Sequence, residues 1–168
     1  MEIDYYEATS LDSKDIIEYL NVIASQTNNL TFGKNELEIN ELQEMQLINE
    51  IHNSINSVMI LAKDGNKIVG MVSLSGESKA RIKHRSNLGI SVLKEYWHQG
   101  IGSSLLAAAI GYAIENDIEI IELEVITTNE NAIKLYEKFG FETIGIYENY
   151  FKIDDEYYDA QLMNLYLW

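Results

Sequence analysis

Two glycines ahead of an apolar helix are the residues of this sequence best suited to hold a ligand. They occur in the run Trp97-His98-Gln99-Gly100-Ile101-Gly102-Ser103, between a β-rich segment and a helix-forming one. Glycine lets the backbone approach a ligand closely and aim N–H groups at it, and the following helix adds its positive N-terminal end. That arrangement suits a pyrophosphate. By itself, a Gly-x-Gly pair is more often only a tight structural turn.

Two other nucleotide-binding patterns do not fit this turn. The phosphate loop of nucleoside-triphosphate enzymes needs Gly-x-x-x-x-Gly-Lys-Ser/Thr, and no such run occurs. The dinucleotide fingerprint Gly-x-Gly-x-x-Gly would need glycine at Leu105, although Glu122 does lie about 20 residues on, where a ribose-binding acid belongs. The turn also follows four expected strands in a chain that ends in antiparallel ones, which does not suit a dinucleotide-binding fold.

The composition limits the partners and the chemistry. A net charge of −15 argues against a nucleic-acid or anionic-membrane partner, and it favours solubility or attraction of a cationic acceptor. The absence of cysteine excludes disulfides, thiolate catalysis and zinc–sulfur sites, and we expect no metal. No apolar run approaches the roughly 20 residues that cross a bilayer, and the N-terminus has no apolar signal core. We therefore expect a cytoplasmic protein.

The basic residues are unevenly spread. Four of the twelve, Lys79, Arg81, Lys83 and Arg85, occupy alternate positions within one short segment. If that segment is extended, all four lie on one face, where they could meet an anionic ligand. A lysine-rich hairpin that guards a sheet edge is an equal alternative.

Periodicity predicts the elements that position the glycine turn. The expected order is β-α-α-β-β-β-α-β-α-β-β in one domain over residues 1–168, with a parallel crossover from Leu88 to Val125. The expected strands are Ile3–Thr9, Ser57–Ala62, Lys67–Leu74, Ser86–Leu93, Ile120–Ile126, Phe141–Phe151 and Tyr157–Leu167. The expected helices are one capped by Ser10 or Asp12, then Glu41–Ser54, Ser103–Asn116 and Glu130–Phe139.

Two motifs together carry a family resemblance. The run Trp97–Ser103 resembles the pyrophosphate loop of GNAT-superfamily N-acetyltransferases, Arg/Gln-x-x-Gly-x-Gly/Ala. The run Asn131–Phe141 resembles their second signature, Asn-x-x-Ala-x-x-Leu-Tyr-x-Lys-x-Gly-Phe in its usual variants. The resemblance implies a mixed α/β fold: a single twisted sheet flanked by helices, whose central parallel strands splay apart around the pantetheine arm of acetyl-coenzyme A.

The resemblance also implies which residues hold acetyl-coenzyme A. The main chain of Ile90 and Val92 would bind the pantetheine, and the N–H groups of Gln99, Gly100, Ile101, Gly102 and Ser103 the pyrophosphate. Asn131 would bond the pantetheine arm, although a helix cap is the alternative. Lys134 and Lys138 lie four residues apart and would meet the 3′-phosphate, or they are simply exposed. Trp97 departs from the motif and cannot make its phosphate contact; His98 is a weak substitute.

Catalysis is assigned less completely. Tyr136 matches the residue that protonates the departing thiolate, and a phenol with a pKa near 10 suits a thiol near 8.5. Core packing is its alternative role. The base is open: Ser86–Leu93 carries no acid, which leaves Glu124, Glu148 and Tyr150, with Glu124 taken tentatively.

The implied activity is direct transfer of an acetyl group from acetyl-coenzyme A to a primary amine, on a small molecule or a peptide, in a ternary complex. The alternative is a catalytically silent acyl-coenzyme A sensor or regulatory module. The aromatic density of Tyr147–Phe151 and Tyr157–Asp159 predicts either an acceptor pocket or a homodimer interface, and we expect a homodimer.

Overall fold

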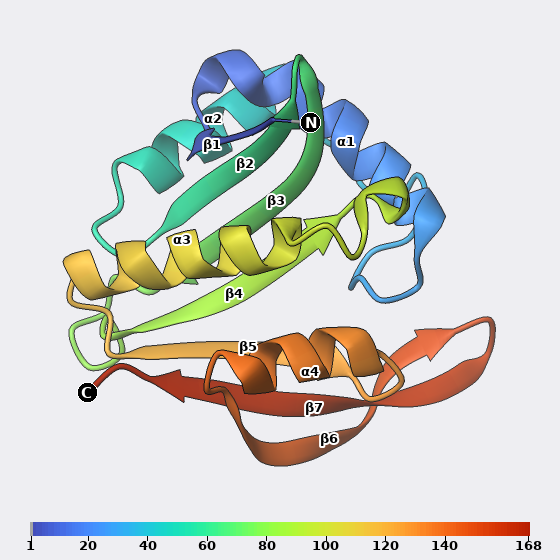
Figure 1. The fold of residues 1–168 in the computed structure, drawn as a ribbon, viewed down its shortest axis with the longest axis vertical. Helices are drawn as coiled ribbons and strands as arrows, with labels where there is room; N and C mark the ends of the chain where they lie inside the picture. Colours follow the sequence, from blue (N-terminus) through green and yellow to red (C-terminus); the bar gives the residue numbers. More distant parts are fainter. Residues whose placement is uncertain (1) are drawn as a thin grey trace.

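A computed structural model describes residues 2–168, which form a seven-stranded sheet in the order β1-β2-β3-β4-β5-β7-β6 (Figure 1). The strands are β1 Ile3–Glu7, β2 Val58–Asp64, β3 Lys67–Gly76, β4 Arg85–Val92, β5 Ile120–Ile126, β6 Glu142–Ile153 and β7 Glu156–Tyr166. The helices are α1 Ser13–Gln26, α2 Glu41–His52, α3 Ile101–Glu115 and α4 Glu130–Lys138, with short 3-10 turns at Ser10–Asp12 and Lys94–Tyr96. The predicted order and the mixed α/β fold class are confirmed.

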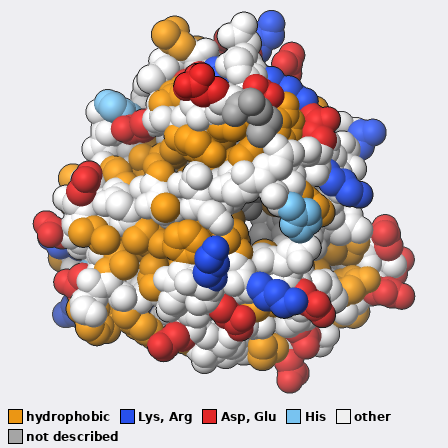
Figure 2. All heavy atoms as spheres, viewed as in Figure 1, with side chains coloured by type: hydrophobic (Ala, Val, Ile, Leu, Met, Phe, Trp, Pro, Cys, Tyr) orange, Lys and Arg blue, Asp and Glu red, His pale blue; other side chains and the backbone are white. Residues whose placement is uncertain are grey.

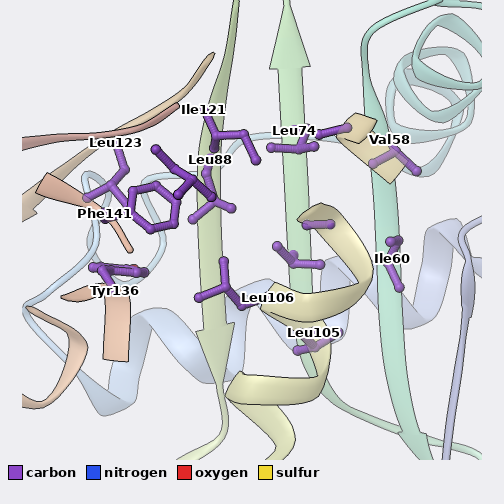
Figure 3. Packing of buried hydrophobic residues seen from close by; sticks show 14 of the residues in the cluster. Val58, Ile60, Leu74, Leu88, Leu105, Leu106, Ile121, Leu123, Tyr136 and Phe141 are labelled. Atoms are coloured by element: carbon purple, nitrogen blue, oxygen red, sulfur yellow. The ribbon is translucent and has the colours of Figure 1, made fainter. Parts of the chain in front are cut away.

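Helices cover the sheet on both faces, with α3 and α4 in front and α2 behind in Figure 1. Strand side chains alternate between the faces. Val58 and Ile60 therefore join the core under α3, whereas Met59 and Leu61 join a second core with α1 and α2. Figure 3 shows Leu105 and Leu106 of α3 directed at the strands. Full burial of each such side chain stabilises the fold by about 1.5–3 kcal/mol.

The two central strands separate along their length. β4 and β5 are parallel, and they pair only where Arg85–Asn87 of β4 lies beside Ile120–Glu122 of β5. Beyond that point β4 stays paired with β3 up to Val92, and β5 stays paired with β7 up to Ile126. The strands diverge from each other in Figure 1, as the resemblance implied.

Three details differ from the predictions. Helix α3 begins at Ile101 rather than Ser103, because its N-cap is Gly100 in the left-handed conformation. The segment from Lys79 to His84 is a turn, closed by the Lys83 N–H on the Lys79 carbonyl, so its basic side chains do not share one strand face. The turn also joins two interior strands, so it guards no sheet edge.

None of the helices within residues 2–168 is both long enough and apolar enough to cross a bilayer.

Candidate active site

A cavity of about 670 Å³ lies where β4 and β5 separate, and it is lined from both faces of the sheet. Figure 2 shows a hollow on the face of α3 and α4, with basic side chains beside it. The lining residues from this face and from α4 include Val92, Trp97, His98, Gly100–Ser103, Asn129, Asn131, Lys134, Leu135, Tyr136 and Lys138. Those from the face of α1 and α2 include Leu20, Ile23, Thr27, Asn29–Phe32, Met71, Ser73, Asn87, Ser91 and Glu124. The cavity therefore passes through the gap from one face to the other.

The main chain of Ile90 and Val92 faces this gap. The Leu93 N–H donates to the Val69 carbonyl at 2.9 Å, so Leu93 directs its main-chain groups at β3. Groups on alternate residues of an antiparallel ladder point the same way, which turns those of Ile90 and Val92 toward β5. Since β5 is not paired with them there, these groups are available to an extended ligand.

The start of α3 offers several free N–H groups to the cavity. The Ser104 N–H bonds the Gly100 carbonyl, whereas the N–H groups of Ile101, Gly102 and Ser103 precede the helical pattern, and no side chain caps them. Gly100 adopts φ 81°, which favours glycine. An anion in the cavity would meet these donors and the positive end of the helix.

Gln99 is the one predicted cofactor residue that does not line the cavity. Its side chain turns back and donates from Nε2 to the Glu95 carbonyl at 3.1 Å. The contact predicted for Gln99 is through its main-chain N–H, and it stays a prediction.

Trp97 lines the cavity, and its indole contacts the main chain of β4. Its indole Nε1–H donates to the Val92 carbonyl oxygen at 2.7 Å. This carbonyl faces the gap, so Trp97 occupies one of the two main-chain acceptors predicted for the pantetheine arm.

Helix α4 supplies the polar side chains of the opposite wall. Its N-cap is Asn129, whose Oδ1 accepts from the Ala132 N–H at 3.4 Å. Asn131 is therefore not the cap, and its amide is exposed at the cavity. Lys134 and Lys138 are also exposed there, and neither forms an ion pair with the rest of the described chain.

Tyr136 packs in the core and also borders the cavity. Its ring is buried in the α3 and α4 core, and the ring centroids of Tyr136 and Phe141 are 5.6 Å apart. Figure 3 shows the two side chains near each other. Burial raises the pKa of the phenol above its ordinary value, so Tyr136 stays protonated through the neutral range.

Glu124 lies on the other face of the gap. Its Oε2 accepts from Asn87 Nδ2 at 3.1 Å, which fixes the carboxylate between β4 and β5. Of the other two candidates for a base, Glu148 is exposed and outside the cavity lining. Burial raises the pKa of Tyr150, and the nearby charge of Glu124 raises it further. Tyr150 does not line the cavity either.

Sequence reasoning missed the wall built by α1 and the loop that follows it. Leu30 and Phe32 line the cavity from this loop, and Leu20 and Ile23 from α1. Tyr19 ties α1 to the site through a 2.8 Å hydrogen bond with Ser91. Large apolar side chains in an otherwise polar loop were the available signal.

Comparison with known proteins matches this chain to one family of enzymes. Residues 23–141 match the profile of the family described as the acetyltransferase (GNAT) family. L-amino acid N-acetyltransferase AaaT of Escherichia coli is 32% identical over 107 residues, which are 62% of this chain and 65% of that protein. N-alpha-acetyltransferase 50 of zebrafish (Danio rerio) is 27% identical over 89% of this chain and 80% of its own length. The match thus spans just under two thirds of the first relative.

Solved structures share the whole fold. A GNAT-family acetyltransferase from Streptococcus pneumoniae superposes with a TM-score of 0.96 at 28% identity, over 99% of this chain and all of that one. YncA from Salmonella typhimurium, solved with acetyl-CoA, has the same fold, with a TM-score of 0.86 at 16% identity over 98% of this chain and 94% of its own. The splayed strands, the glycine turn and the family match agree, and the chain belongs to the acetyltransferase (GNAT) family.

Proposed function

We propose that this protein transfers the acetyl group of acetyl-coenzyme A to the amino group of an acceptor, by direct attack in a ternary complex. The observation that carries the proposal is one cavity that joins the two faces of the sheet. Tyr136 lies on one face of the gap and Glu124 on the other. Two substrates that enter from opposite faces would meet between these side chains.

The face of α3 and α4 suits acetyl-coenzyme A. The free N–H groups at Ile101–Ser103 match a pyrophosphate, and the unpaired lysines of α4 match a further phosphate. The gap-facing main chain of Ile90 matches the amides of a pantetheine arm. Because Trp97 holds the Val92 carbonyl, Ile90 would carry more of that contact.

The face of Glu124 suits the amine. Its carboxylate attracts the ammonium form of the acceptor and accepts a proton from it, directly or through water. The neutral nitrogen then forms a bond to the acetyl carbonyl carbon and gives up its second proton to water as the carbon–sulfur bond breaks. The thiolate takes the proton of the Tyr136 hydroxyl, and the phenolate regains a proton from water.

The acceptor class is narrowed by the relatives. AaaT is named for L-amino acids and the zebrafish protein for N-alpha-acetylation, and both names denote an α-amino group. We therefore propose an α-amine as the acceptor.

Thiol release from acetyl-coenzyme A with a panel of amines tests the proposal. We expect turnover with α-amines, and a fall in kcat of about 10²-fold for Glu124→Gln, typical of losing an acid–base group. Glu148→Gln is the matched control, since Glu148 is an exposed acid outside the cavity lining, and it should keep the wild-type rate. Calorimetric binding of acetyl-coenzyme A without turnover on any amine would instead identify a silent acyl-coenzyme A sensor.

A further inference from the structure

We propose that the acceptor is the N-terminus of a peptide or protein whose first side chain is large and apolar, rather than a free amino acid. This inference rests on the proposed function and names the substrate class of the same site. It comes from the wall of the cavity that lies beyond Glu124, on the face of α1 and α2.

That wall is apolar and incompletely buried. Ile23 is buried in the second core, with Leu20, Leu30 and Met71 packed against it as partly buried side chains. All four line the cavity. Phe32 lines it too and is partly buried, yet it packs into none of the core clusters of the described chain. An aromatic ring in that position is free to contact a ligand side chain.

This wall and the proposed base share one face of the sheet. Ser91 of β4 bonds Tyr19 of α1, so odd-numbered β4 side chains face α1. Asn87 is another of them, and it bonds Glu124. The proposed base and the apolar side chains of Phe32 and Met71 therefore line the same face of the cavity, opposite the lysines of α4.

The charges on this face argue against a free amino acid. The basic residues that line the cavity are His98, Lys134 and Lys138, which belong to the glycine turn and to α4. On the face of α1 and α2 the lining residues include one charged group, Glu124, and no Lys, Arg or His. The carboxylate of a free amino acid would lie there without a counter-charge, which is costly. The amide that replaces it in a peptide is neutral, and Thr31 and Ser73 offer it hydrogen-bonding groups.

The first test compares acceptors that differ in one feature at a time, with saturating acetyl-coenzyme A and thiol release as the readout. Methionine amide should be acetylated with a kcat/KM about tenfold or more above that of free methionine, since the two differ in the carboxylate charge. Peptides that begin with Met, Leu or Phe should exceed matched peptides that begin with Ser or Asp by about ten- to a hundredfold, the value of burying such a side chain.

Variants of the wall provide the second test. Phe32→Ala should lower kcat/KM for the Phe- and Met-initiated peptides and leave the Ser-initiated peptide unchanged, which a general loss of folding would not do. Leu42→Ala removes an apolar side chain that is 64% exposed on α2, outside the cavity, and should change neither.

Two results would overturn the inference alone: free methionine used as well as its amide, or no preference between apolar and polar first residues. Acetyl-coenzyme A binding without turnover on any of these amines would overturn the proposed function, and the inference with it.

Discussion

Tyr136 combines a core ring with a hydroxyl that the fold does not use. The ring packs against Phe141. Burial is the sole cause of its raised pKa, with no hydrogen bond to another side chain or to the main chain contributing. A phenylalanine would fill the same volume without leaving a partner group unsatisfied. Removing the hydroxyl oxygen therefore tests the proposed catalytic role of Tyr136 without disturbing the packing of its ring.

Tyr136→Phe should reduce kcat by about 10²-fold while the affinity for acetyl-coenzyme A and the free energy of unfolding change little. The measurement is thiol release at saturating acceptor, with calorimetry and denaturant unfolding as controls. A folded variant that turns over at the wild-type rate would show that Tyr136 serves only the core.

Among the elements, the N-terminus of α3 depends on one backbone conformation. Gly100 adopts φ 81° at the border of the cavity, and a Cβ added there would meet no atom within 4 Å. Gly65, in the turn between β2 and β3, adopts φ 58° and has the same open space beside it. The two glycines carry the same kind of backbone strain on substitution, and only one of them lies at the proposed phosphate site.

Gly100→Val and Gly65→Val should each destabilise the fold by about 1–3 kcal/mol, the cost of a left-handed residue with a side chain. Only Gly100→Val should also weaken acetyl-coenzyme A binding in calorimetry, because its side chain enters the space that an anion needs. Equal affinities in the two folded variants would contradict a phosphate site at α3.

The lysines of helix α4 allow a separate test of the contact proposed for the 3′-phosphate of coenzyme A. Coenzyme A should bind more tightly than dephospho-coenzyme A, and the Lys134→Gln/Lys138→Gln double variant should lose most of that difference. Lys79→Gln, in the turn before β4 and outside the cavity lining, is the control. A difference that survives the double variant would remove the two lysines from the site.

At the scale of the whole molecule, the half of the sheet formed by β5, β7 and β6 carries exposed apolar side chains. Ile144, Ile146, Tyr147 and Tyr157 are each more than half exposed, and β6 is an edge strand. Trp168, beyond the end of β7, is 78% exposed. Exposed apolar side chains gathered on one part of a protein mark interaction sites. A second copy of this chain is the occupant we propose for this surface.

Light scattering should therefore give twice the monomer mass of 19.2 kDa at micromolar concentrations. The Tyr147→Ser/Tyr157→Ser double variant should shift the mass toward the monomer, whereas Leu11→Ser, which alters a 91% exposed leucine on another part of the chain, should not. A monomer mass for the unmodified protein across that range would refute the homodimer.

The sequence by itself determined the order of the elements, the fold class and the family, because these follow from local periodicity and two short motifs. It also indicated the glycine turn and Tyr136, which lie within those motifs. Tertiary structure decided what depends on contacts across the chain. Glu124 lines the cavity and accepts a hydrogen bond from Asn87, whereas Glu148 and Tyr150 lie outside the lining. The Trp97 indole reaches the Val92 carbonyl. The apolar wall unites residues of α1, its loop and β3 that no local pattern connects. Periodicity reports which side of an element is buried, whereas only the packing of elements shows which side chains surround the same space.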